Sequence, residues 1–207
     1  MLLVGLTGGI GAGTSTVSAL LAEHGAVIVD ADQVARDLQA PGSPMLDRMA
    51  ERFGRDILRE DGSLDRAAVA ARVFGDTPEA RAALADLNAI THPAIQRESE
   101  ARIGAHRGSD AVVVLDHPLL GEHPRDDLAA TIVVDVPVDV AVERLVSARG
   151  MDESDARNRI ASQISREARL ATATHVIDNA GDLDGLRRDV AALWDELVRQ
   201  RDATSPS

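Results

Sequence analysis

Five short apolar runs occur along the chain, at Leu2–Thr7, Ala26–Asp30, Ala111–Asp116, Thr131–Val136 and His175–Asp178. Their residues are mainly leucine and β-branched, and they do not alternate with polar positions. This pattern is typical of parallel strands that are buried on both faces. Because longer helical patterns separate the runs, the sequence predicts an α/β fold with a doubly wound parallel sheet of about five strands.

The stretch at about residues 31–110, between the second and third runs, has no strand pattern. Turn residues at Pro41-Gly42, Asp61-Gly62 and His92-Pro93 divide it into several predicted helices. Two interpretations remain open for these helices. They form either an insertion on the acceptor side of a cleft or crossover helices that cover the sheet.

Further helical patterns follow in the second half of the chain. One at about residues 138–170 precedes the last strand and is a candidate lid, and a final helix is expected at about Leu183–Arg201. The tail, residues 202–207, has the composition of a disordered end. No repeat or low-complexity linker interrupts the chain, so we expect residues 1–207 to form a single domain with mobile parts.

Composition and charge exclude several classes of function. The formal charge of −12 argues against a broad nucleic-acid or anionic-membrane surface. The chain has no cysteine, which excludes disulfides and thiolate metal sites. No apolar run approaches the roughly 20 residues that a membrane helix needs, so we expect a cytoplasmic protein. Lysine is absent, and all 22 basic residues are arginine.

A glycine-rich turn follows the first strand at the point where a phosphate-binding loop belongs. It consists of Gly8, Gly9, Ile10, Gly11, Ala12, Gly13, Thr14, Ser15 and Thr16. Glycines allow successive backbone N–H groups to turn toward an anion, and the helix that follows adds its partial positive charge. Ser15 stands where a hydroxyl holds Mg²⁺ in such loops. The alternative is a glycine turn used for packing alone.

Thr14 departs from the usual pattern G-x-x-x-x-G-K-[ST], in which lysine follows the last glycine. That lysine stabilises the charge that develops on the phosphates during transfer. Its loss is expected to cost about 10²-fold in rate, on the order of 3 kcal/mol. Because the chain has no lysine elsewhere, only an arginine or a metal ion can compensate.

Two aspartates follow predicted strands and are candidates for chemistry. Asp32 could accept a proton from an attacking hydroxyl or hold a metal through water, whereas Asp30 or Asp32 could simply cap the next helix. Asp116 could orient Mg²⁺ or the acceptor, or cap the turn after its strand. His92 is interpreted as part of a packed helix start.

Arginines gather in the candidate lid, at Arg149, Arg157, Arg159, Arg166 and Arg169. Their planar guanidinium groups suit a clamp on phosphate oxygens, and a lid that carries them would exclude water. The alternative is an exposed helix with ion pairs to neighbouring acids. Similarly, Asn179 and Gly181 follow the last strand and form either a nucleotide-binding loop or an ordinary turn.

Several motifs, taken in order, resemble the dephospho-coenzyme A kinases. The likeness is carried by Gly5–Gly13 with Ser15–Val17, Val29–Asp32 with Ala35-Arg36 and Pro41-Gly42, Asp61–Arg66, Val73-Phe74, His92-Pro93, Asp116 with Pro118–Leu120, Arg144-Leu145, Arg149, Arg159, Gln163, and Asp178-Asn179 with Gly181. It spans about residues 2–181. Each piece is weak alone, but the ordered set is specific.

The resemblance implies a P-loop NTPase-like fold that uses ATP and Mg²⁺ to phosphorylate the ribose 3′-hydroxyl of dephospho-coenzyme A. It implies that Asp32 is the base and that Arg149 contacts the transition state. It also assigns Asn179 and Gly181 to the adenine loop, and Asp116, Leu119 and His92 to the acceptor side.

Three residues depart from the family pattern: Thr14 in the phosphate loop, and His117 and Gly121 in the substrate loop, where apolar residues are usual. Two alternatives therefore stay open beside the kinase. One is a catalytically impaired homologue that binds a nucleotide or coenzyme A, and the other is a kinase for another small-molecule hydroxyl. The sequence does not indicate an oligomeric state.

Overall fold

The computed structural model describes residues 1–204, which form two compact units. Of the described residues, 1–29 and 105–204 belong to one unit, and the other is Asp30–Gly104. Each unit has its own cluster of buried apolar side chains. The second unit corresponds to the helical insertion expected at about residues 31–110, and the single-domain organisation stays a prediction.

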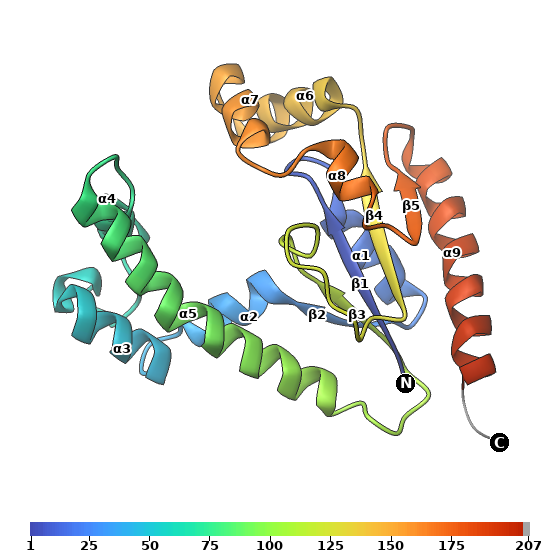
Figure 1. The fold of residues 1–207 in the computed structure, drawn as a ribbon, viewed down its shortest axis with the longest axis horizontal. Coiled ribbons are helices and arrows are strands. Elements are labelled where there is room, and N and C mark those ends of the chain that lie inside the picture. The colour runs from blue at the N-terminus through green and yellow to red at the C-terminus, as the bar shows by residue number, and fades with distance from the viewer. Residues whose placement is uncertain (205–207) are drawn as a thin grey trace. The chain divides into compact units, whose positions relative to one another are not determined.

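The strands form a five-stranded sheet with the strand order β2-β3-β1-β4-β5 (Figure 1). The strands are β1 (Leu2–Gly8), β2 (Val27–Asp30), β3 (Val112–Asp116), β4 (Ala130–Asp135) and β5 (His175–Asp178). The pairings of β1 with β3, β1 with β4, and β4 with β5 are parallel. The predicted α/β fold with a five-stranded parallel sheet is therefore confirmed.

The place of each strand in the sheet explains its sequence. The central strand β1 has all seven residues buried, which requires an unbroken apolar run. The edge strand β5 has four residues and leaves Val176 51% exposed. Pairing sets Leu6 opposite Asp116 and Gly8 opposite Val134. The carboxyl ends of β3 and β4 therefore flank the start of the glycine-rich loop.

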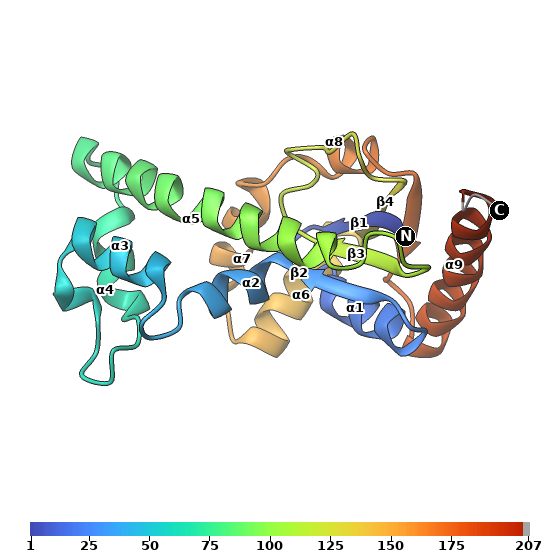
Figure 2. The ribbon, with the colours of Figure 1, turned by 90° about the horizontal axis from the view of Figure 1, so that it is seen from below.

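Five helices belong to the sheet unit: α1 (Thr14–Glu23), α6 (Val138–Arg149), α7 (Glu153–Ala161), α8 (Arg166–Leu170) and α9 (Leu183–Thr204). Figure 2 shows α1 and α8 on opposite sides of the strands. Helix α9 packs on α1, with the Trp194 ring stacked on His24. Helix α9 also includes residues 202–204, which were expected in a disordered tail, while 205–207 lie outside the described residues.

The second unit is helical, with α2 (Ala31–Leu38), α3 (Pro44–Phe53), the 3₁₀ helix η1 (Arg55–Ile57), α4 (Arg66–Val73) and α5 (Pro78–Gly104). Figure 1 shows α5 as its longest helix, and α2, α3 and α4 all contact it. The predicted break at His92-Pro93 is wrong, because α5 runs through Pro93. Proline removes one backbone hydrogen bond there, but the neighbouring Ile90 and Ala94 pack on the unit's core and hold the helix.

Among residues 1–204, no helix is both long and apolar enough to cross a membrane.

The start of α2 is capped by Asp30 rather than by Asp32. The Asp30 carboxylate accepts hydrogen bonds from the backbone N–H groups of Asp32 and Gln33, at 2.8 and 3.0 Å. We predict that Asp30→Ala lowers the free energy of unfolding by about 1 kcal/mol, because two N–H groups lose their acceptor. Urea denaturation measures this change. Asp32→Ala is the matched control, and an equal loss in that variant would contradict the assignment.

Candidate active site

The glycine-rich loop between β1 and α1 has the backbone shape of an anion cradle. Gly11 and Gly13 adopt positive φ angles of 80° and 89°, which side-chain-bearing residues rarely adopt. Gly13 is the N-cap of α1, yet no side chain caps this helix and its first turn has no acidic residue. The positive end of the α1 dipole is therefore left uncompensated by the protein.

Backbone donors converge at this helix start. Within residues 1–204, the N–H groups of Gly11, Gly13, Thr14 and Ser15 have no protein acceptor. Most buried or half-buried N–H groups in proteins have a partner, so several open donors between Gly11 and Ser15 indicate a ligand site. A phosphate group suits them, because its oxygens accept several hydrogen bonds and its charge matches the helix dipole.

The loop is held from behind by a buried amide. Asn179, 8% exposed, follows β5 and donates from Nδ2 to the Ala12 carbonyl oxygen at 2.8 Å. Arg144 on α6 donates from Nη2 to the Asn179 carbonyl oxygen at 2.7 Å. A Cβ on Gly13 would stand 2.4 Å from Asn179 Nδ2, so glycine is required there for space as well as for φ.

The oxygen donors around the loop fit a magnesium ion. Ser15 is exposed in the first turn of α1, and Asp116 ends β3 beside the strand that leads into the loop. A hydroxyl and a carboxylate are the hard oxygen ligands that Mg²⁺ prefers.

Thr14, in contrast, has no charge, and its methyl group lies 2.7 Å from where a Cβ of Gly8 would be. The Thr14 methyl therefore packs back onto the loop.

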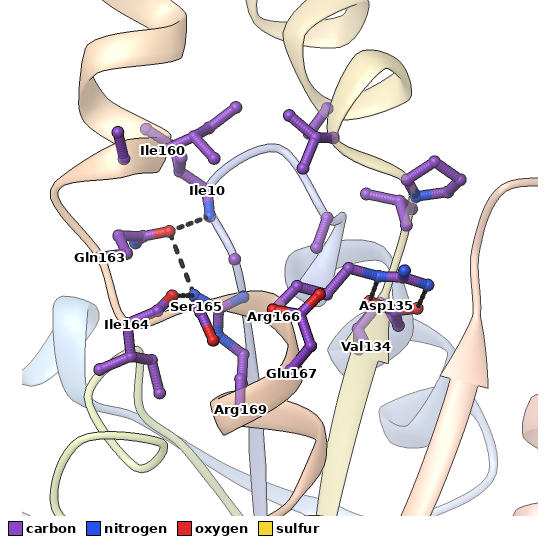
Figure 3. A pocket seen from close by; sticks show the side chains of 17 residues that line it. Ile10, Val134, Asp135, Ile160, Gln163, Ile164, Ser165, Arg166, Glu167 and Arg169 are labelled. Carbon is purple, nitrogen blue, oxygen red and sulfur yellow. Dashed lines mark hydrogen bonds and ion pairs between the residues drawn. The ribbon is translucent and has the colours of Figure 1, made fainter.

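A cavity of about 470 Å³ lies beside the loop (Figure 3). Its walls are the loop at Gly9, Ile10 and Ala12, the end of β4, the start of α6, and the segment from Ile160 to Arg169. The lid segment contacts the loop directly, because Gln163 Oε1 accepts a hydrogen bond from the Ile10 N–H at 3.0 Å. The side chain of Arg169 lies next to Gln163 in the same view.

Arg166 and Asp135 form a two-pronged ion pair at the cavity wall. The guanidinium donates from Nε and Nη2 to the two carboxylate oxygens, at 2.8 and 2.6 Å. These side-chain hydrogen bonds raise the pKa of Arg166. The carboxylate at the end of β4 is thereby neutralised, so it repels an incoming phosphate less than a bare acid would.

Three of the lid arginines, Arg149, Arg157 and Arg159, lie outside the set of residues that line the cavity. Arg149 ends α6 as an exposed residue, and Arg159 is exposed on α7. Arg157 pairs with Glu153 at 3.0 Å, which is the ion-pair alternative considered for this segment. Arg169 is different, since it is 8% exposed and lines the cavity. The sequence pattern singled out Arg149 and gave no reason to prefer Arg169.

The other predicted site residues lie in different parts of the chain. Asp32 is exposed near the start of α2, and His92 is exposed inside α5, so both belong to the second unit. In the sheet unit, Leu119 is 38% exposed after β3. Gly181 is exposed after β5, with open space around it.

Comparison with known proteins identifies the family. Residues 2–185 match the family model described as dephospho-CoA kinase. The chain belongs to the dephospho-CoA kinase family. A dephospho-CoA kinase from Streptomyces avermitilis is 49% identical over 203 residues, covering 97% of this chain and 96% of that protein. One from Corynebacterium glutamicum is 50% identical over 200 residues, covering 96% and 98%.

A solved structure shares the fold of this chain. The crystal structure of TT1252 from Thermus thermophilus is similar with a TM-score of 0.77 and 30% sequence identity, and the match covers 95% of this chain and 97% of that one. A dephospho-CoA kinase from Campylobacter jejuni, 21% identical, has the same fold with a TM-score of 0.66, and the match covers 94% of this chain and 96% of that one.

The hydrogen bond from Asn179 Nδ2 to the Ala12 carbonyl oxygen, which we call the brace, can be tested by mutation. We predict that Asn179→Asp weakens ATP binding about tenfold or more, because a carboxylate oxygen would face the Ala12 carbonyl oxygen in place of a donor. Isothermal titration calorimetry measures the affinity. Asn158→Asp, on the exposed face of α7, adds the same charge as a control. Equal affinities in the two variants would contradict the brace.

Proposed function

We propose that this chain transfers the γ-phosphoryl group of ATP to the ribose 3′-hydroxyl of dephospho-CoA, giving CoA and ADP. Membership of the dephospho-CoA kinase family supports the ATP-dependent conversion of dephospho-CoA to CoA. The observation that carries the proposal is the glycine-rich loop and the start of α1, where the N–H groups of Gly11, Gly13, Thr14 and Ser15 lack protein acceptors within the described residues. Such a cradle binds the phosphates of a nucleotide.

The transfer forms one P–O bond and breaks another. The 3′-oxygen attacks the γ-phosphorus, the bond to the β–γ bridging oxygen breaks, and ADP leaves with that oxygen. The hydroxyl proton needs an acceptor, and we assign this role to Asp32. The family likeness supports the assignment, as does the observation that Asp30 already caps α2. The Asp32 carboxylate is exposed and not used as the helix cap.

Oxygen ligands near the cradle would hold the metal. Ser15 would supply its hydroxyl to Mg²⁺, and Asp116 would orient the metal or the acceptor. When bound, Mg²⁺ neutralises negative charge on the phosphate oxygens. The loop residues from Gly8 to Thr16 would surround the phosphates. Asn179 would have two roles in this scheme. Its side chain fixes the loop, and the family likeness assigns its backbone, together with Gly181, to the adenine side.

The acceptor side is assigned by family likeness. Leu119 and His92 are proposed to contact dephospho-CoA, and Arg149 is proposed to contact the transferring group. All three side chains are exposed, so each is accessible to a ligand. A small-molecule acceptor is the partner that these assignments require.

The test is direct turnover. The purified chain is incubated with Mg²⁺-ATP and dephospho-CoA, and CoA is followed by mass spectrometry. We expect CoA to form with equimolar ADP. Absence of CoA, in the presence of measurable ATP binding, would instead support the impaired binding homologue that Thr14 suggests. Phosphorylation of other hydroxyl compounds but not of dephospho-CoA would move the assignment to a different acceptor.

Asp32→Asn tests the base. We predict a fall in kcat of about 10²-fold or more with little change in ATP affinity, because the amide cannot accept the hydroxyl proton. Asp37→Asn is the control, since this acid lies on the same helix and pairs with Arg102. Unchanged turnover in Asp32→Asn would remove the base assignment and leave the kinase assignment intact.

A further inference from the structure

Because the phosphate loop has no lysine, the positive charge that would stabilise the phosphates has to come from another group. Thr14 is neutral, and the chain contains no lysine. Backbone N–H groups supply only partial charges. A guanidinium group close to the loop is therefore the protein group that can take over, and the cavity beside the loop is lined by two, Arg166 and Arg169.

Arg166 already forms an ion pair with Asp135. Both oxygens of Asp135 accept its hydrogen bonds, so the net charge of the pair is close to zero. Breaking this pair to reach a phosphate would leave the Asp135 side chain, 13% exposed, as an uncompensated acid. Arg166 is for this reason a poor candidate.

Arg169 has no such partner. Among residues 1–204, its hydrogen bonds go only to neutral oxygens, from Nη2 to Gln163 Oε1 at 3.4 Å and to the Ile164 carbonyl oxygen at 3.3 Å. Both are long for N–H···O bonds. The residue is nevertheless only 8% exposed. A buried charge without a counter-charge is costly, and in proteins such a charge normally has an anionic partner.

The space around Arg169 is made by two glycines. A Cβ on Gly9 would stand 2.9 Å from Arg169 Nη1, so the missing side chain allows the guanidinium to lie against the phosphate loop. Gly9 does not adopt a positive φ, so its glycine is not explained by backbone conformation. A Cβ on Gly121 would stand 2.8 Å from Ile164 Cδ1 and 3.3 Å from Arg169 Cγ, so this departure from the family pattern makes room for both side chains.

We infer that Arg169 is the catalytic cation that replaces the phosphate-loop lysine, with its guanidinium on the β- and γ-phosphates of ATP. The inference rests on the proposed kinase function. The counter-charge that Arg169 lacks in the protein is supplied by the nucleotide. Its planar fork meets two phosphate oxygens at once.

The experiment is a double-mutant cycle between positions 14 and 169. Turnover is measured for the natural chain, Arg169→Gln, Thr14→Lys and the double variant. We expect Arg169→Gln to lower kcat by about 10²-fold, the usual loss for one preorganised donor to the transition state. In the Thr14→Lys background we expect a loss below about tenfold, because the lysine then supplies the charge. Equal losses in both backgrounds would overturn the inference.

Binding provides a readout that does not need turnover. ATP affinity is measured by calorimetry, and we expect Arg169→Gln to weaken it about tenfold or more through the loss of charge-assisted hydrogen bonds. The matched control is Arg157→Gln, an exposed lid arginine paired with Glu153, which should bind ATP as the natural chain does. Unchanged ATP affinity in Arg169→Gln would overturn the inference even in a chain that makes no CoA.

Controls distinguish a folding defect from a loss of function, and failure of the proposed function from failure of the inference. Thermal unfolding of each variant checks the fold, and Arg169→Met, which keeps most of the apolar stem, takes the place of Arg169→Gln if the latter unfolds. No CoA from either the natural chain or Thr14→Lys would reject the proposed function, and ATP binding would then decide on Arg169. CoA from Thr14→Lys but not from the natural chain would overturn the inference directly.

Discussion

The hydrogen bond from Asn179 Nδ2 to the Ala12 carbonyl oxygen is the contact on which the site depends. A loop that keeps four N–H groups open for a ligand forgoes the internal hydrogen bonds that would otherwise fix it. It has to be held from outside. Asn179 holds it from the end of β5, and Arg144 joins this contact to α6. The cradle is thus built by three elements that are far apart in the sequence.

Charge around this loop is arranged locally, against the sign of the whole molecule. The chain carries a net charge of −12, which by itself disfavours a polyphosphate ligand. The α1 start compensates by having no acid in its first turn. Of the two carboxylates that line the cavity, Asp135 is neutralised by Arg166 and Glu167 is exposed to solvent. Removing local negative charge and leaving Arg169 uncompensated makes the cavity suitable for an anion.

The sheet could be predicted from the sequence because the apolar composition of each strand follows from how deeply that strand is buried. Leu2–Thr7 reads as an unbroken apolar run since β1 is covered on both sides. The glycine-rich turn was also predictable, because Gly11 and Gly13 adopt positive φ angles that residues with side chains rarely adopt. The failure at Pro93 shows the limit of such local rules. Packing of the flanking turns outweighed the one hydrogen bond that proline removes.

The lid contacts could not be predicted, because they depend on where the chain returns in space. Gln163 and Ile10 are 153 positions apart, and no local sequence pattern at either residue indicates that the two are in contact. Five arginines stood within one segment, and their local patterns did not differ enough to separate Arg169 from Arg149. What separates them is burial and position, because Arg169 is buried and lines the cavity whereas Arg149 is exposed and does not. Those properties arise only when α8 packs beside β4 and the loop.

The source of the charge alters what the lid does. A lysine at position 14 would belong to the loop and would be present in every state of the enzyme. Arg169 is carried by the lid segment, which reaches the loop through the Gln163–Ile10 hydrogen bond. Delivery of the catalytic charge and covering of the phosphates then depend on one docking contact. In this chain the lid supplies the electrostatic stabilisation that a loop lysine would otherwise give, so the exclusion of water and the stabilisation of the transition state become a single event.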